Sequence, residues 1–269
     1  MNSIFSLTGK TAVVTGAGGF FGRYFTRALL EQGARVIIIE KSLSSLDFFS
    51  QEHEDRYESH FVDLYDRQAA DECYKKILSE NRVDILVNNA FDFGKKTGFN
   101  TDEGRIENAT FEQFQASFES GIYWAIQATQ AFGLKMKEQG KGSVINICSM
   151  YAVVVPSPDL YEGTDKFNPP GYSMAKAGLL QFTKYAASFL SPEVRVNAIS
   201  PGAIPNLESK TNNSIGSDDP VLMRLSKKIL LNRMGHPDDL TGALVFLASD
   251  ASSYITGQNI IIDGGLTVT

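Results

Sequence analysis

The feature that most constrains the fold of this chain is a regular alternation of short apolar runs with longer segments of helical periodicity. The runs are rich in β-branched residues, which favours strands, at residues 11–15, 35–39, 85–87, 143–148, 195–199 and 259–262. Helices are predicted at residues 21–32, 67–79, 111–137, 172–190, 220–230 and 237–248. This alternation predicts βαβ units, and therefore an α/β fold with a doubly wound parallel sheet covered by helices on both faces.

The length and composition predict one domain. The chain has 269 residues, of which 43% are hydrophobic, and no repeat or linker divides it. Residues 1–269 are therefore expected to form a single domain. Three irregular stretches, at residues 91–109, 151–171 and 202–219, each follow a predicted strand. Because ligands bind beyond the carboxyl ends of strands in such sheets, these stretches are expected to form the walls of an active site.

Charge and cysteine usage exclude several classes of function. The net charge is −6 and no block of lysine and arginine stands out, so neither nucleic acid nor a membrane is an expected partner. The two cysteines lie far apart without ligand spacing, so no metal site or disulfide is expected. The first residues do not resemble a signal peptide, and no long apolar run occurs. We expect a cytoplasmic protein whose partner is a small-molecule substrate.

A glycine-rich turn between the first strand and the first helix predicts a dinucleotide site. Gly16, Gly19 and Gly22 allow a tight turn, and the helix N-terminus offers free N–H groups to a pyrophosphate. Glu40 ends the second strand, where a carboxylate accepts hydrogen bonds from ribose hydroxyls and repels a 2′-phosphate. NAD is therefore favoured over NADP, although a solvated charge beside Lys41 is the alternative interpretation. Asp63 follows another apolar pair and is either an adenine contact or an ordinary turn residue.

A tyrosine and a lysine four residues apart indicate the reaction chemistry. Tyr172 and Lys176 open a predicted helix and lie on one face of it, so the ammonium favours the phenolate form. A phenolate there can remove a proton from an alcohol and return it to a carbonyl. Ser149 follows the strand at 143–148, where its hydroxyl can hold the reacting oxygen or simply end the strand. Asn89 and Ala90 follow the strand at 85–87 and either line the pocket or form a turn.

Taken together, these residues resemble the short-chain dehydrogenase/reductase family along essentially the whole chain. The matching motifs are the TGAGGFFG turn, Asp63, Asn88-Asn89-Ala90, Ser149, Tyr172 with Lys176, Pro201-Gly202, and residues 232–240 through Asp263-Gly264-Gly265. The resemblance implies a Rossmann-type domain, catalysis by Ser149, Tyr172 and Lys176, and a homo-oligomer, either a tetramer or a dimer. It also implies a substrate lid formed by the loop 202–219 and the helix 220–230. The cofactor contacts it implies are Gly16, Gly19, Phe21, Gly22, Glu40, Asp63, Leu64, Asn89, Ala90, Tyr172, Lys176, Pro201, Gly202 and Ile204.

The sequence departs from the usual family pattern in three places. The glycine spacing is similar to that of sugar-nucleotide epimerases and dehydratases, and Phe20 occupies the place of the usual middle glycine. Gly121 stands where an asparagine normally helps to position a water in the proton relay. Asn206 stands where a threonine often meets the nicotinamide carboxamide. The segments 158–165 and 179–187 are similar to a branch of flagellin-modification or nonulosonic-acid-pathway oxidoreductases.

The predicted function is NAD-dependent interconversion of a secondary alcohol and a ketone by hydride transfer, on a polar, sugar-like substrate. The substrate class follows from polar residues expected beside the reacting centre: Asp159, Tyr161, Glu162, Thr164, Asp165 and Asn168. Solvation of an exposed loop is the alternative explanation for these residues. Two other functions stay open, a sugar-nucleotide epimerase or dehydratase and a catalytically weak cofactor-binding regulator.

Overall fold

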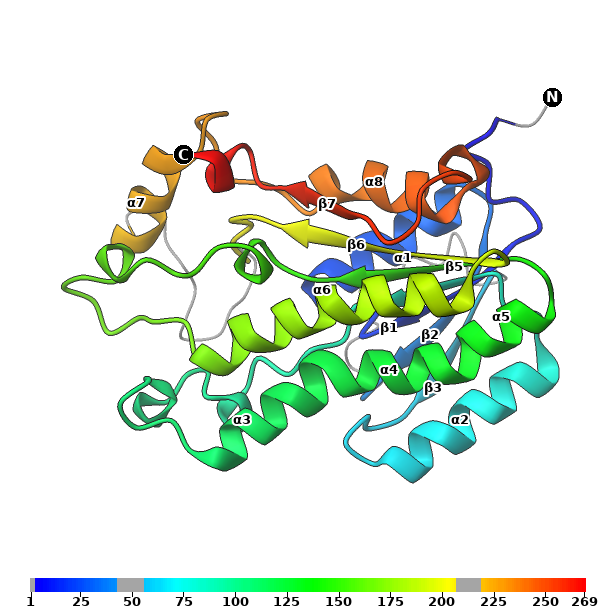
Figure 1. The fold of residues 1–269 in the computed structure, drawn as a ribbon, viewed down its shortest axis with the longest axis horizontal. Coiled ribbons are helices and arrows are strands. Elements are labelled where there is room, and N and C mark those ends of the chain that lie inside the picture. The colour runs from blue at the N-terminus through cyan, green and yellow to red at the C-terminus, as the bar shows by residue number, and fades with distance from the viewer. Residues whose placement is uncertain (1–2, 43–55, 207–218) are drawn as a thin grey trace.

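The fold is a parallel sheet between two layers of helices (Figure 1). The computed structural model describes residues 3–42, 56–206 and 219–269. Within these residues a seven-stranded sheet has the order β3-β2-β1-β4-β5-β6-β7, and every neighbouring pair is parallel. The strands are β1 Thr11–Thr15, β2 Arg35–Glu40, β3 Tyr57–Phe61, β4 Ile85–Asn88, β5 Gly142–Ile147, β6 Val194–Pro201 and β7 Asn259–Ile262. The predicted single-domain, doubly wound α/β fold is confirmed.

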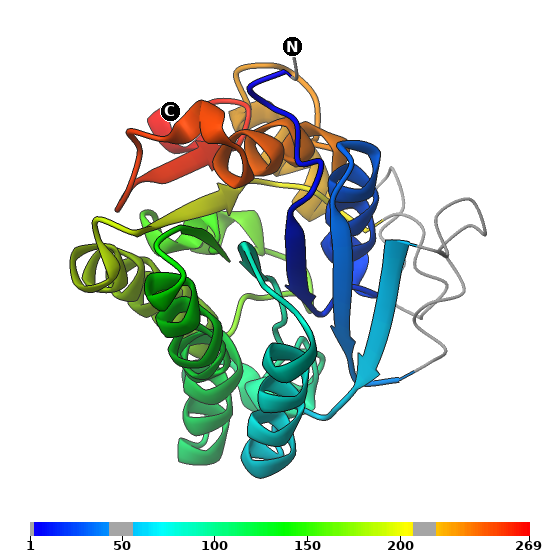
Figure 2. The same cartoon turned by 90° about the vertical axis from the view of Figure 1, so that its right-hand side faces the viewer.

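Helices cover both faces of the sheet, as Figure 2 shows. They are α1 Phe20–Glu31, α2 Arg67–Glu80, α3 Phe111–Phe118, α4 Trp124–Ala128, α5 Leu134–Glu138, α6 Pro170–Leu190, α7 Pro220–Lys228 and α8 Asp238–Ala248. One buried cluster joins the sheet to α1 and α8 through Phe25 and Leu244. A second cluster joins the opposite face to α2 and α6 through Tyr74 and Leu190. Burial of these apolar faces on both sides of the strands is what favours a parallel sheet.

The helix predicted at residues 111–137 is present but contains two wider turns. A capping box formed by Thr110 and Gln113 begins α3. Five-residue π-helical segments, Glu119–Tyr123 and Thr129–Gly133, separate α3 from α4 and α4 from α5. The first of these segments places Gly121 against α6, so its geometry bears directly on the active site.

Strand β3 was missed in the sequence. Its residues, YESHF, are mostly polar and lie at the edge of the sheet, where none of them is fully buried. The apolar periodicity that identifies buried strands is therefore absent from β3. The polar side chains of β3 form hydrogen bonds at this edge of the sheet: Glu58 accepts from His60 on the same strand and from Arg35 on β2.

Short 3₁₀ turns occupy the connections at the carboxyl edge of the sheet. They include Lys95–Thr97, Asp102–Gly104, Met150–Ala152 and Pro158–Leu160, and two others, Asp250–Ser252 and Leu266–Val268, lie near the C-terminus. In the part of the chain that the structure describes, no helix is long and apolar enough to span a membrane.

Candidate active site

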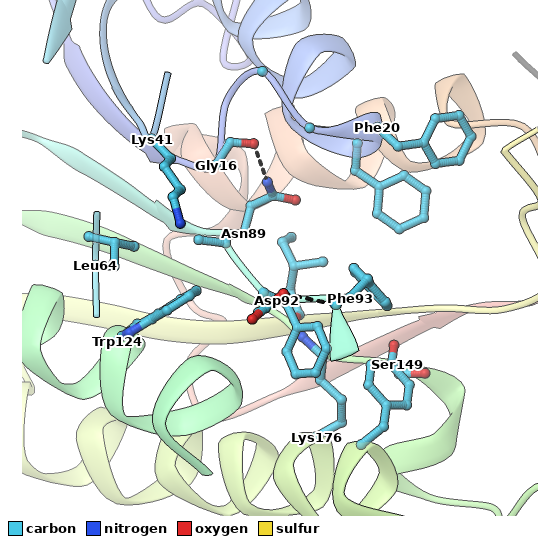
Figure 3. Close-up of a pocket in the computed structure, with 18 of the residues that line it drawn as sticks. Gly16, Phe20, Lys41, Leu64, Asn89, Asp92, Phe93, Trp124, Ser149 and Lys176 are labelled. Atoms are coloured by element: carbon cyan, nitrogen blue, oxygen red, sulfur yellow. Dashed lines mark hydrogen bonds between the residues drawn. The ribbon is translucent and has the colours of Figure 1, made fainter. Parts of the chain in front are cut away.

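A large cavity lies at the carboxyl edge of the sheet (Figure 3). Its volume is about 1030 Å³, and it is lined by residues at or just after the carboxyl ends of five different strands. Gly16 follows β1, Glu40 ends β2, Asn89 follows β4, Ser149 follows β5 and Pro201 ends β6. The space is sufficient for a dinucleotide together with a small substrate.

The glycine-rich turn forms one wall, and its shape depends on the missing side chains. Gly16 has a φ of +64°, and a Cβ there would lie 2.9 Å from the Cα of Ala90. A Cβ on Gly22 would lie 2.1 Å from the carbonyl oxygen of Gly16, so this glycine supports the turn from beneath and does not line the cavity. The amide of Asn89 donates to the carbonyl oxygens of Thr15 and Gly16, at 3.1 and 2.9 Å.

The start of α1 suits a phosphate group. Gly19 precedes the helix and, within the described residues, no side chain caps its first N–H groups. A glycine cradle that a Cβ would fill and an uncapped helix N-terminus are the two features that bind the pyrophosphate of a dinucleotide. The residues present therefore fit a nicotinamide dinucleotide.

Charged side chains line the end of the cavity that lies beside the glycine-rich turn. A carboxylate oxygen of Glu40 accepts a hydrogen bond from the backbone N–H of Gly18 at 2.8 Å. The Nζ atom of Lys41 lies 2.9 Å from a carboxylate oxygen of Asp63, and this hydrogen bond raises the pKa of Lys41. Asp63 therefore lies in the cavity as predicted, but it is paired with a lysine that sequence reasoning had treated only as a neighbour of Glu40.

Sequence reasoning missed an aromatic wall at the same end of the cavity. Trp124 on α4 lines the cavity close to Leu64, and its ring meets that of Tyr65 edge-on at 4.9 Å. The hydroxyl of Tyr65 donates to Asp92 at 2.8 Å. No local motif marks Trp124, because only the packing of α4 beside β4 brings it to the edge of the sheet.

Tyr172 and Lys176 lie at the opposite end of the cavity, one turn apart on α6, together with Ser149. Lys176 is only 3% exposed, and its Nζ donates to the carbonyl oxygen of Ile147 at 2.9 Å. Burial lowers the pKa of Lys176 to about 8. Burial also raises the pKa of Tyr172 to about 12, and a side-chain hydrogen bond with Ser149 acts in the opposite direction. The three residues predicted to be catalytic therefore lie together at this end of the cavity.

Three phenylalanines surround the ring of Tyr172, and the sequence analysis did not identify them as site residues. The ring centroids of Phe91, Phe93 and Phe99 lie 5.2, 5.8 and 5.6 Å from that of Tyr172. Phe91 and Phe93 also line the cavity. Their position directly after the Asn88-Asn89-Ala90 motif was the available signal, since residues that follow a central strand reach the carboxyl edge of the sheet.

The structure explains why residue 121 is a glycine. A Cβ at Gly121 would lie 2.6 Å from the Cβ of Ala175 and 3.1 Å from Cε2 of Phe91. The space beside this backbone is thus filled by neighbouring side chains. An asparagine at this position would require Phe91 or α6 to move.

The loop between Ser149 and Tyr172 does not place its acidic residues in the cavity. Of the six polar residues expected beside the reacting centre, only Asn168 lines it; Asp159, Tyr161, Glu162, Thr164 and Asp165 do not. Asp159 is exposed and pairs with Lys228 on α7, with 3.0 Å between its carboxylate oxygen and Nζ. The expectation was wrong for these five because hydrogen bonds and packing turn the loop toward α7.

Only part of the predicted lid can be described. Pro201, Gly202, Ile204 and Asn206 line the cavity, whereas residues 207–218 lie outside the described ranges. Helix α7 packs on the 151–171 loop, and Arg224 donates to the carbonyl oxygens of Leu160 and Glu162. Within the described ranges no group of three or more histidine, cysteine or acidic residues could hold a metal ion.

Comparison with known proteins gives matches over nearly the whole chain. Residues 19–267 match the family model described as Enoyl-(Acyl carrier protein) reductase. The chain is 31% identical over 268 residues to galactitol 2-dehydrogenase (L-tagatose-forming) of Cereibacter sphaeroides, a match that covers 99% of this chain and 98% of the relative.

Solved structures share the fold. A putative NAD(P)-dependent gluconate 5-dehydrogenase from Beutenbergia cavernae with bound NADP has a TM-score of 0.84 at 28% identity, and the match covers 99% of this chain and 100% of that one. A short chain dehydrogenase from Leptospira borgpetersenii with bound NAD⁺ has a TM-score of 0.82 at 31% identity, over 99% and 96% of the two chains.

Proposed function

The chain belongs to the short-chain dehydrogenase/reductase family, and from this premise we propose that it oxidises a secondary hydroxyl of a polar, sugar-like compound reversibly, with NAD as cofactor. Membership makes it an NAD(P)-dependent oxidoreductase that interconverts an alcohol and a ketone. The observation that carries the proposal is that Ser149, Tyr172 and Lys176 share one cavity with the glycine-rich turn.

Tyr172 is the proposed acid/base. In the oxidative direction its phenolate removes the proton from the substrate hydroxyl, and in the reductive direction the phenol returns it. Lys176, one helical turn away, stabilises the phenolate by its charge, and Ser149 holds the reacting oxygen by a hydrogen bond. The bound nicotinamide supplies the acceptor or donor of the hydride.

The preference for NAD rests on Glu40. Its carboxylate lies at the tip of β2 beside the glycine-rich turn, where it would accept hydrogen bonds from the ribose of a bound dinucleotide and repel a 2′-phosphate. Lys41 is the nearby group that could favour NADP, but its ammonium is paired with Asp63. The remaining cofactor contacts that we propose are those of the predicted set that line the cavity, which leaves out Gly22.

Two features of the cavity support a sugar-like substrate. Asn168 lines the cavity, and its side-chain amide is a group that can hydrogen-bond a substrate hydroxyl. Phe93 is 57% exposed beside Tyr172 and presents an aromatic face to the C–H face of a sugar. The names of galactitol 2-dehydrogenase and gluconate 5-dehydrogenase, to which the chain is similar, agree with this class.

A substrate panel tests the proposed function. Purified protein with NAD⁺ is offered galactitol, other polyols and sugar acids, and in parallel a steroid alcohol and simple aliphatic alcohols. Formation of NADH is the readout. We expect turnover confined to the polyols and sugar acids, whereas efficient turnover of the steroid without response to the sugar panel would overturn the proposal.

Assembly and lid movement complete the proposal. Tyr185 and Phe189 on α6 are exposed by 68% and 57%, which supports a homo-oligomer, either a tetramer or a dimer, that buries this face. Light scattering would give the number of subunits. We also propose that α7, which lies within the predicted lid, contributes to the substrate side of the site, where Arg224 and the pair of Lys228 with Asp159 join it to the 151–171 loop.

A further inference from the structure

The buried lysine lies against two aromatic rings. The Nζ atom of Lys176 lies 5.0 Å from the ring centroid of Phe91 and 5.9 Å from that of Tyr172. Its one hydrogen bond in the described structure goes to the carbonyl oxygen of Ile147. Among the described residues, no carboxylate acts on this ammonium. A buried ammonium with so few partners carries a large desolvation cost.

Phe91 is fixed in its position by contacts on several sides. Its ring meets Tyr172 edge-on, with an interplanar angle of 81°, and also packs against Phe93 and Phe99. On the remaining side the bare backbone of Gly121 makes room for it, since a Cβ there would come within 3.1 Å of the ring. Phe91 therefore contacts both Lys176 and Tyr172 and has little freedom to turn away.

We propose that Phe91 is a positioning residue of the active site, whose ring holds the Lys176 ammonium by a cation–π contact and, through it, favours the phenolate of Tyr172. The negative face of the ring offsets part of the desolvation cost of the ammonium. Gly121 is required for this position of Phe91, because only a residue without a side chain leaves space for the phenylalanine ring. The inference deepens the proposed function, on which its catalytic consequence rests.

The other groups around the two residues do not replace Phe91. Besides Tyr172, the titratable group that acts on Lys176 is the thiol of Cys148, whose own pKa burial raises to about 12, so it is neutral near pH 7. Ser149, Cys148 and Tyr151 face Tyr172, and none of them carries a charge at that pH. Among the described residues the rings near the Lys176 ammonium are thus those of Phe91, at 5.0 Å, and Tyr172, at 5.9 Å, and Phe91 is the nearer of the two.

A direct titration of Lys176 tests this proposal without requiring a substrate. The protein is labelled with ¹³Cε-lysine, the Lys176 signal is assigned by its loss in Lys176→Met, and its pKa is measured by NMR. We expect Phe91→Leu to lower the pKa of Lys176 by about one pH unit, because a desolvated cation–π contact is lost. Phe91→Tyr, which keeps the ring, should stay close to the wild-type value.

Phe99→Leu is the matched control. It removes another ring that packs on Tyr172 at 5.6 Å, but the structure gives Phe99 no cation–π contact with Lys176. We expect the pKa of Lys176 to be unchanged in this variant. An equal fall in both leucine variants would overturn the proposal, because general loosening of the aromatic cluster would then explain the shift.

A second series of variants at position 91 keeps the proposal testable if the Phe91→Leu variant misfolds or admits water. Fluorinated phenylalanines at position 91 keep the shape of the ring and weaken its negative face stepwise. The pKa of Lys176 should fall with each added fluorine, and the rising limb of the oxidation rate should move to higher pH in parallel. A flat pKa series would overturn the proposal. A graded pKa series with no turnover on any alcohol would instead sustain the role of Phe91 and contradict the proposed function.

Discussion

The two ends of the cavity differ in the kinds of residue that form them. At the nucleotide end, the charged side chains of Glu40, Lys41 and Asp63 lie beside a backbone turn; Glu40 and Asp63 are partly exposed, and the side chain of Lys41 is 66% exposed. At the reacting end, Tyr172 and Lys176 are enclosed by aromatic rings, and burial shifts the pKa of both. Water screens the first group of charges, whereas the second group interacts in a low dielectric. A change at the reacting end should therefore have the larger effect, and chiefly on turnover.

The largest expected effect comes from Tyr172→Phe. This change removes the proton donor and leaves the packing and the nucleotide end nearly unchanged. Turnover should fall by at least about a hundredfold while the Kd for NADH stays within a few-fold. Steady-state kinetics and fluorescence titration with NADH measure the two quantities. Ser173→Ala, at the next position of α6, is the control for effects of substituting this helix that do not involve the phenol. Turnover near the wild-type value would show that the acid/base lies elsewhere.

The pH dependence should distinguish the two directions of the reaction. Burial raises the pKa of Tyr172 to about 12 in the protein alone, so the phenol predominates at neutral pH. Oxidation requires the phenolate, and its kcat/KM should therefore rise with pH, by about tenfold per unit below the apparent pKa. Reduction requires the phenol and should be constant below that pKa and fall above it. Oxidation that slows as the pH rises from neutrality would contradict this assignment.

A third prediction tests how tightly the reacting end is packed. Gly121→Ala places a Cβ 2.6 Å from that of Ala175, and overpacking of this kind costs about 1–3 kcal/mol. The control is Gly242→Ala on α8, where a Cβ meets nothing within 4 Å. This control should be stabilised by up to about 1 kcal/mol, because alanine favours a helix. Urea unfolding measures both, and a Gly121→Ala variant as stable as the Gly242→Ala variant would show that the corner is loosely packed.

At the nucleotide end, Glu40→Gln should narrow the preference for NADH over NADPH. The amide keeps an oxygen that can accept the hydrogen bond from Gly18, but it no longer repels a 2′-phosphate. The Kd for NADPH divided by the Kd for NADH should decrease by roughly tenfold, equivalent to about 1.4 kcal/mol. Lys41→Gln is the control, and its exposed ion pair should change the ratio by less than about threefold. Tighter binding of NADPH than NADH by the wild-type protein would refute the assignment to NAD.

The smallest effects are expected in the loop before α6. Asn168→Leu removes a polar side chain from the cavity lining and should raise the KM for a polyol by about fivefold to tenfold, with kcat less affected. Asp159→Ala breaks an exposed pair with Lys228 outside the cavity lining and should leave KM within about twofold. If the aspartate variant had the greater effect on KM, the loop would have to close over the substrate differently.

The sequence predicted what depends on local pattern and strand order. The apolar runs, the glycine-rich turn and the spacing of Tyr172 and Lys176 were enough to place the cavity, because parallel strands end at one edge of the sheet. Strand β3 was missed since an edge strand lacks a buried face. Phe91 and Gly121 could not be paired from the sequence, because their contact depends on how the helix after residue 110 packs on α6. The acidic loop residues were misplaced for the same reason, since Asp159 pairs with Lys228 of α7 and the backbone carbonyl oxygens of Glu162 and Asp165 accept hydrogen bonds from Arg224 and Arg105.

The most direct test of the account follows a single hydrogen. Galactitol, or whichever polyol the panel identifies, is prepared with deuterium on its carbinol carbons and incubated with the protein and NAD⁺. Mass spectrometry of the released cofactor should show one deuterium in each NADH, together with a keto product. A product that retains the label with no net NADH, as an epimerase or dehydratase would give, or binding of NAD⁺ without transfer of label to it from any polyol, would contradict the assignment of this cavity to reversible alcohol oxidation.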